Sequence, residues 1–165
     1  MPFDLIVAVL VGSVLFCFGF VLLFGAPFLP TLRPQIAAAL DLLNLEPGQT
    51  LLELGCGDGR VLIAAAECGL HAVGYELNPI LVVIARLRTW RYRQQVRVVW
   101  GDYWRASWPP AEGIFAFILT SYMHKLDKKV TRYPHKPLKV ASFAFPIPGK
   151  KPIKTNNGIF LYEYK

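Results

Sequence analysis

The sequence predicts an α/β domain, with a largely parallel sheet covered by helices on both faces, preceded by one helix long enough to cross a membrane. Short apolar runs alternate with stretches of helical character, and the first run, residues 50–54, leads into three glycines at alternate positions and then a helix. A strand, a glycine turn and a helix in this order form the ligand-binding corner of many α/β folds. An uncharged apolar segment, residues 5–24, predicts the membrane helix.

Composition limits the chain to one modest domain and one anchor. The 165 residues are 54% hydrophobic with a mean hydropathy of +0.38, and much of that excess lies at the N-terminus. The formal net charge is +7, so the remainder is strongly basic. Cys17, Cys56 and Cys68 are odd in number and have no metal-type spacing, which predicts reduced thiols and no metal site.

The N-terminal segment is expected to be a retained single-pass anchor, residues 1–26, followed by a domain over residues 27–165. A signal peptide needs a positive start and a small-residue cleavage site, whereas this chain has Asp4 and no Lys or Arg before Arg33. Because all the basic residues lie C-terminal to the anchor, the positive-inside tendency places the domain in the cytoplasm.

A helix and a turn are expected before the first strand. Pro34 suits the first turn of a helix over Gln35 to Leu43, and residues 46–49 form a turn leading into the strand at residues 50–54. The helix after the glycine turn is expected to stop near Gly69.

The glycine turn itself favours a cationic ligand. Gly55, Gly57 and Gly59 permit positive φ and let a ligand lie against bare backbone. Their spacing is one residue tighter than the dinucleotide pattern G-x-G-x-x-G, although an NAD site stays open as an alternative. Glu53 lies two residues before the first glycine, and a carboxylate there suits a cation better than a phosphate.

The second strand, residues 72–76, ends on an acidic residue. Glu76 lies 21 positions after Gly55, and an acid at this point can accept both ribose hydroxyls of a nucleoside. Asn78 and Pro79 then cap and start a helix that we expect to run from Ile80 to Arg93. The face of this helix expected to be buried consists of Leu81, Ile84, Ala85 and Leu87.

Two further strands should end beside the same crevice, because ligands bind at the carboxyl ends of strands in open α/β sheets. Residues 96–100 lead to Asp102 and Tyr103, and residues 113–119 lead to Tyr122. Strands are also expected over residues 138–145 and 159–164, the latter after a hairpin-like turn at residues 156–158. The basic stretch 125–139 is interpreted as a solvated surface, as a surface for anionic lipid headgroups or, less readily in a tethered chain, as one for nucleic acid.

Several motifs together resemble a family of small, membrane-anchored lysine methyltransferases of class I, the seven-β-strand type that uses S-adenosylmethionine. The motifs are residues 27–31 (PFLPT), 52–60 (LELGCGDGR), 74–79 (GYELNP), 85–88 (ARLR), 143–148 (FAFPIP) and 159–164 (IFLYEY). The resemblance implies a Rossmann-like class I sheet. Mitochondrial members modify the adenine nucleotide translocase and the c subunit of ATP synthase.

The resemblance also implies roles for single residues. Glu53 and Asp58, with the three glycines, would serve the methionine end of S-adenosylmethionine, Glu76 the ribose and Asp102 the adenine. Tyr103 would stack on the base, and Tyr122 is the candidate catalytic residue.

This chain departs from the family in two places. It has Leu119-Thr120-Ser121-Tyr122 where the family tends to carry a Leu-x-Pro-like turn, and it lacks a basic, Ser-rich mitochondrial presequence. We therefore expect a prokaryotic plasma membrane.

The sequence thus predicts a membrane-bound methyltransferase that acts on a lysine of a membrane protein, with no nucleic-acid partner. Methylation of a lipid or quinone is one alternative, and a catalytically inactive membrane scaffold is another. No Asn/Asp-Pro-Pro-Tyr/Phe box follows the strand at residues 113–119, which argues against a DNA adenine enzyme.

Overall fold

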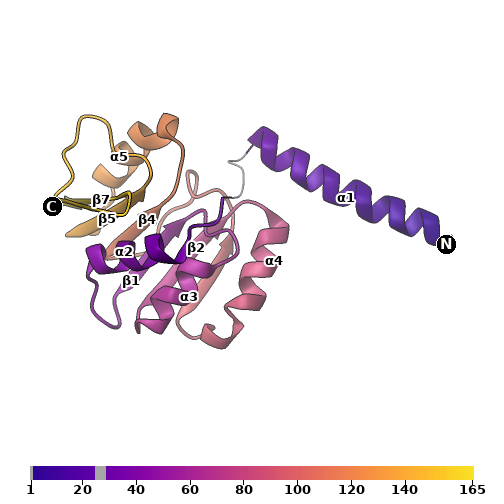
Figure 1. Cartoon of the computed structure of the whole chain (residues 1–165), viewed down its shortest axis with the longest axis horizontal. Coiled ribbons are helices and arrows are strands. Elements are labelled where there is room, and N and C mark those ends of the chain that lie inside the picture. Colours follow the sequence, from indigo (N-terminus) through magenta and orange to yellow (C-terminus); the bar gives the residue numbers. More distant parts are fainter. Residues whose placement is uncertain (1, 25–28) are drawn as a thin grey trace.

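The structure, a computed structural model, describes residues 2–24 and 29–165, without the side chains of residues 16–18 and 20–24. The apolar segment forms one helix, α1 (Phe3–Phe24), which extends away from the remaining elements in Figure 1. Among the described residues, no helix satisfies both the length and the hydropathy expected of a membrane-crossing segment. The predicted boundary at residues 26 and 27, and Pro27 and Phe28 of the PFLPT motif, lie outside the described residues.

In the described part of the chain, seven strands form one mixed sheet in the order β3-β2-β1-β4-β5-β7-β6. Strands β3, β2, β1, β4 and β5 are parallel, β7 is antiparallel to β5, and β6 is antiparallel to β7. Their bounds are β1 Thr50–Leu54, β2 His71–Glu76, β3 Val96–Trp100, β4 Gly113–Ala116, β5 Leu138–Phe143, β6 Lys154–Asn156 and β7 Ile159–Tyr164. The sequence analysis did not predict β6, which is short and has three exposed residues.

Helices cover both faces of the sheet, as predicted. The α-helices of the domain are α2 Arg33–Leu43, α3 Arg60–Glu67, α4 Pro79–Arg88 and α5 Met123–Thr131, and two short 3₁₀ helices are η1 Trp90–Tyr92 and η2 Thr120–Tyr122. Because side chains alternate along a strand, Leu51 joins the core under α2, α3 and α4, while Leu52 joins the core under α5. Figure 1 shows α2, α3 and α4 lying over the sheet.

Three elements are shorter than predicted. The strand expected over residues 113–119 ends at Ala116, so Ile118 and Leu119 leave the sheet and line a cavity at its edge. The strand expected over residues 138–145 ends at Phe143, because Ala144 has a left-handed φ of 66°. The helix expected to reach Arg93 ends at Arg88 and is followed by η1.

The predicted buried face of α4 is wrong in part. Ala85 is buried, but the structure buries Val82 beside it and leaves Ile84 and Leu87 exposed. The reason is close packing against the glycine turn: a Cβ atom built on Gly59 would lie 3.3 Å from the Ala85 Cβ. Only a small side chain fits this contact, so the helix turns its small residues inward and its large ones outward.

Candidate active site

A cavity of about 600 Å³ opens at the carboxyl ends of β1, β2 and β4. The segment that follows α1, residues 29–31, forms part of its wall together with the glycine turn and the loops after β3, β4 and β5. The volume suits a ligand of nucleoside size. Eight of the nine predicted site residues line it: Glu53, Gly55, Gly57, Asp58, Glu76, Asp102, Tyr103 and Tyr122.

The glycine turn lies flat against β2. Gly55 and Gly57 have φ values of 89° and 52°, which L side chains rarely adopt. The backbone N–H groups of Gly55 and Cys56 both donate to the Tyr75 carbonyl, at 3.0 and 2.8 Å. Gly74 makes this approach possible, because a Cβ atom there would lie 2.6 Å from the Cys56 Cβ. The ninth predicted residue, Gly59, caps α3 and packs against Ala85 and Thr89 of the α4 region instead of lining the cavity.

Glu53 is a buried carboxylate at the floor of the cavity. Only 4% of its surface is exposed, and its Oε2 atom has no hydrogen-bond partner among the described residues. Burial, followed by the charges of Asp58 and Glu76, raises the pKa of Glu53 well above its ordinary value. A buried acceptor without a partner is costly. The site therefore fits a ligand that brings a cationic donor, such as the ammonium group of an amino acid.

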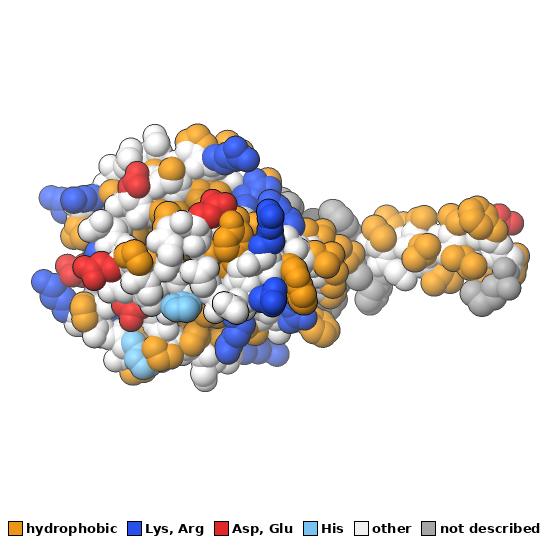
Figure 2. Space-filling view, turned by 90° about the horizontal axis from the view of Figure 1, so that it is seen from below, with side chains coloured by type: hydrophobic (Ala, Val, Ile, Leu, Met, Phe, Trp, Pro, Cys, Tyr) orange, Lys and Arg blue, Asp and Glu red, His pale blue; other side chains and the backbone are white. Residues whose placement is uncertain are grey.

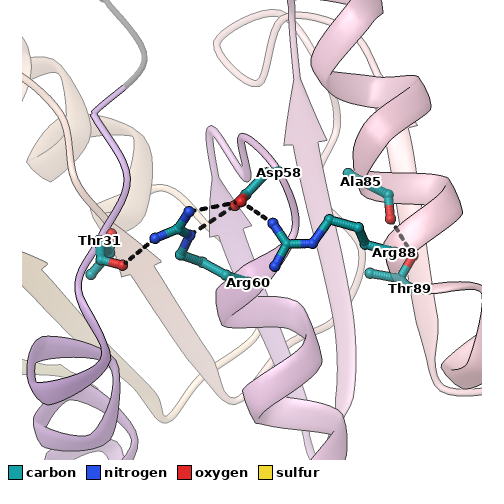
Figure 3. Close-up of polar contacts among 6 residues, drawn as sticks. All are labelled: Thr31, Asp58, Arg60, Ala85, Arg88 and Thr89. Carbon is teal, nitrogen blue, oxygen red and sulfur yellow. Dashed lines mark hydrogen bonds and ion pairs between the residues drawn. The ribbon is translucent and has the colours of Figure 1, made fainter.

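Asp58 lies beside Glu53 but is held by two arginines (Figure 3). Arg60 donates from Nε at 2.9 Å and from Nη2 at 2.8 Å, and Arg88 of α4 donates from Nη1. Burial alone would raise the pKa of Asp58, but the hydrogen bonds and charge of Arg60 and the charge of Arg88 outweigh it and lower that pKa. Asp58 therefore joins the turn to α4, a role that sequence analysis missed because Arg88 is 30 positions away.

Arg60 also connects the site to the segment after α1. Its Nη1 atom donates to the Thr31 carbonyl at 3.2 Å, and the Thr31 residue is buried (Figure 3). The cofactor turn and the segment leading from α1 are thus joined by one guanidinium group.

The two remaining carboxylates are oriented by backbone donors. Glu76 accepts from the N–H of Gly57 at 2.9 Å through Oε2 and from that of Asn78 at 2.8 Å through Oε1. Asp102 accepts from the N–H of Trp104 at 2.7 Å. Each carboxylate oxygen has a second lone pair, so both groups can still accept from a ligand.

An aromatic wall closes the side of the cavity next to α5. The Tyr103 and Trp104 ring centroids are 4.8 Å apart, and those of Trp104 and Tyr122 are 5.8 Å apart. The Lys125 ammonium lies over the Trp104 ring, 4.5 Å from its centroid. Burial and the charge of Asp102 raise the pKa of Tyr103, which keeps its hydroxyl neutral. Trp104 and Lys125 were not predicted, and only their closeness in sequence to Tyr103 and Tyr122 pointed to them.

Comparison with known proteins identifies the family. A family model described as the ANTKMT methyltransferase domain matches residues 53–154, which is more than half of the chain. The chain belongs to this family. Adenine nucleotide translocase lysine N-methyltransferase of Mus musculus is 35% identical over 130 residues, which cover 77% of this chain and 56% of the relative. The Homo sapiens lysine N-methyltransferase that is named for the c subunit of ATP synthase is 36% identical over 124 residues, covering 74% and 53%.

A solved structure supports both the fold and the cofactor of this ANTKMT-family chain. An RNA methyltransferase from Salinibacter ruber in complex with S-adenosyl-L-homocysteine superposes with a TM-score of 0.75 at 28% identity, covering 82% of this chain and 92% of that one. The fold is that of the class I methyltransferases, and the cofactor is S-adenosylmethionine. The chain spans about half the length of the curated relatives it matches.

Proposed function

We propose that the protein is an S-adenosylmethionine-dependent protein-lysine N-methyltransferase that acts at a membrane. The observation that carries the proposal is the Glu53 carboxylate, buried and without a partner on its Oε2 atom among the described residues, beside a glycine turn in a chain of the ANTKMT family. When bound, S-adenosylmethionine supplies a methyl group activated by its sulfonium. The lysine-directed activity of the relatives supports lysine as the acceptor.

Four features of the chain would hold the cofactor. Glu53 would accept from the ammonium of the methionine end, and the bare backbone of Gly55 and Gly57 lets that end approach the turn. Glu76, already oriented by two backbone N–H groups, would accept from the ribose hydroxyls. Asp102 would accept from the adenine amino group.

The acceptor must reach the site as a neutral amine. The reference pKa of lysine is about 10.4, and lowering it to about 7 costs roughly 4 kcal/mol. Two features supply this in the proposal. The rings of Trp104, Tyr122 and Phe145 exclude water from the cavity wall, and the Lys125 ammonium adds a like charge nearby. Tyr122, which lines the opening, is the proposed contact with the acceptor.

The proposal also places the protein in a membrane. We assign α1 as the single-pass anchor, residues 27–165 as the methyltransferase domain, and the cytoplasmic face of a prokaryotic plasma membrane as its location. The support is the run of 20 uncharged residues, the absence of Lys and Arg before Arg33, and residues 29–31 in the cavity wall. A membrane protein is then the natural substrate, because both partners share one surface.

Specific observations favour two alternative acceptors. The relative from Salinibacter ruber is described as an RNA methyltransferase, and this chain carries a net charge of +7, so RNA is one. Membrane location equally suits a lipid or quinone, which is the other. An inactive scaffold is a third function that the same fold could serve.

A single labelling experiment separates these functions. Purified full-length protein and radiolabelled S-adenosylmethionine are incubated with membranes and with total RNA from a strain that lacks the gene. The products are then divided into protein, organic and RNA fractions. We expect one labelled membrane-protein band, hydrolysis of which yields methyl-lysine.

Two variants control the labelling experiment. Glu53→Gln should abolish the label, whereas Glu163→Gln, an exposed change in β7 outside the cavity, should leave it intact. Label in the organic or RNA fraction would replace lysine with that acceptor. Absence of label in every fraction, with S-adenosylhomocysteine still bound, would establish the scaffold.

A further inference from the structure

Helix α4 turns its more apolar face away from the domain. Its small and polar residues Val82, Ala85 and Thr89 are buried, and the helix packs on β2 and β3 at one edge of the sheet. Its outward face carries four large aliphatic side chains, of which 37% to 71% of the surface is exposed: Ile80, Val83, Ile84 and Leu87. An amphipathic helix of a soluble domain normally has the opposite orientation.

Two tryptophans extend this apolar surface. Trp90 follows the end of α4 and Trp100 ends β3, and 64% of each side chain is exposed. The Trp100 Nε1 atom donates to the Leu77 carbonyl at 3.1 Å, which holds the ring beside the start of α4. Tryptophan is enriched where protein meets the headgroup region of a bilayer.

The same region is uniformly cationic. Residues 77–101 contain five arginines and no acidic residue: Arg86, Arg88, Arg91, Arg93 and Arg97. Arg88 pairs with Asp58 and Arg86 donates to the Val98 carbonyl. The other three are exposed, and the Arg93 guanidinium lies 5.2 Å from the centre of the Trp90 ring. We call the exposed aliphatic residues, the two tryptophans and these three arginines the α4 face.

The α4 face lies on the side of the domain from which α1 extends. Figure 1 places α4 at that end of the sheet, opposite β5 and β7. In Figure 2 the Lys and Arg side chains gather at the same end, with hydrophobic side chains among them. A surface of mixed charge would not match five arginines without an acidic residue, whereas an anionic bilayer would.

We propose that the α4 face lies on an anionic phospholipid bilayer, with its aliphatic and tryptophan side chains at the headgroup boundary and its arginines on lipid phosphates. This inference rests on the proposed membrane location and goes beyond it, because it fixes which side of the domain faces the lipid. The turn that holds the cofactor is linked to this face, since Arg88 pairs with Asp58.

Tryptophan quenching by lipid tests the orientation in the full-length protein. The protein is reconstituted in vesicles of phosphatidylcholine alone, or with phosphatidylglycerol, that contain lipid brominated near the headgroup. We expect strong quenching on anionic vesicles, less on neutral ones, and a loss of most of the quenched component in Trp90→Phe/Trp100→Phe. Arg91→Gln/Arg93→Gln/Arg97→Gln should lower the docking equilibrium constant by roughly a hundredfold and return the quenching to the neutral level.

A charge-matched variant and a flotation assay complete the test. Lys151→Gln/Lys154→Gln/Lys165→Gln removes three exposed cations near the opposite edge of the sheet and should leave the quenching unchanged. Vesicle flotation without lipid quenching of Trp90 and Trp100 would overturn the orientation while leaving the anchor intact, and would assign the face to a protein partner or a second copy. Failure to float would overturn both. Quenching without any methylation would overturn only the proposed activity.

Discussion

Glu53 and Asp58 are neighbouring carboxylates whose surroundings shift their pKa values in opposite directions. Glu53 lacks a partner on Oε2 among the described residues and its pKa is raised by burial, while Asp58 binds two guanidinium groups and its pKa is lowered. The first group is thus costly in the ligand-free protein and available to a cation, and the second stabilises the turn. Each assignment leads to a prediction at the scale of one residue.

Glu53→Gln should stabilise the ligand-free protein and weaken cofactor binding. A neutral amide removes the cost of ionising a buried carboxyl group, so the Tm at pH 7 should rise. The loss of a charge-assisted hydrogen bond should raise the Kd for S-adenosylhomocysteine by about 10- to 100-fold. Differential scanning fluorimetry with and without the ligand measures both effects. An unchanged Kd would remove Glu53 from the site.

Asp58→Asn should lower stability in a pH-dependent way. The pKa of Asp58 is lower in the folded chain than in the unfolded chain, where it is about 3.9. Its stabilisation is therefore present above pH 3.9 and is lost as the pH falls through the folded pKa. Chemical denaturation should show a loss of about 1–2 kcal/mol at pH 7, discounted because both arginines are partly exposed, and a smaller loss near pH 3. A difference independent of pH would contradict the pairing.

At the scale of elements, the glycine turn and β2 depend on a glycine in the strand and not only on those in the turn. Gly74→Ala would place a Cβ atom 2.6 Å from the Cys56 Cβ and 2.7 Å from the Leu62 Cδ1, and overpacking of this kind costs about 1–3 kcal/mol. Gly101→Ala is the matched control, because nothing lies within 4 Å of the added atom and its φ is not positive. Urea denaturation of the two variants measures the difference, and equal stabilities would show that the turn can move away from β2.

The sequence predicted those elements that depend on local pattern. The strands at residues 50–54, 96–100 and 159–164 have their predicted bounds, and the turn before the last strand is confirmed by the positive φ values of Asn157 and Gly158. Contacts between distant segments could not be predicted. The orientation of α4 depends on Gly59 accepting only a small neighbour, and the end of β5 depends on the backbone of Ala144. Among the site residues the carboxylates were found by spacing, whereas Arg60 and Arg88 emerged only with the fold.

At the scale of the whole molecule, the proposed anchor should restrict the enzyme to substrates in its own membrane. Sharing a surface raises the effective concentration of a target without any new contact. With enzyme and substrate in the same vesicles, methylation should be on the order of a hundredfold faster than with the two in separate vesicles. A filter-binding assay on both mixtures measures the ratio, and detergent, which abolishes the compartments, should equalise the rates. Equal rates before detergent is added would contradict tethering.

The Arg60–Thr31 hydrogen bond has a consequence for reach. Residues 29–31 belong to the cavity wall, and Thr31 is fixed to the helix that follows the cofactor turn, so the length of chain available between α1 and the site is only that from Phe24 to Leu29. Five residues span at most about 18 Å when fully extended. With α1 in the bilayer, the enzyme is a ruler: it selects lysines by their height above the membrane, and a lysine presented well beyond that height stays unmodified whatever sequence surrounds it.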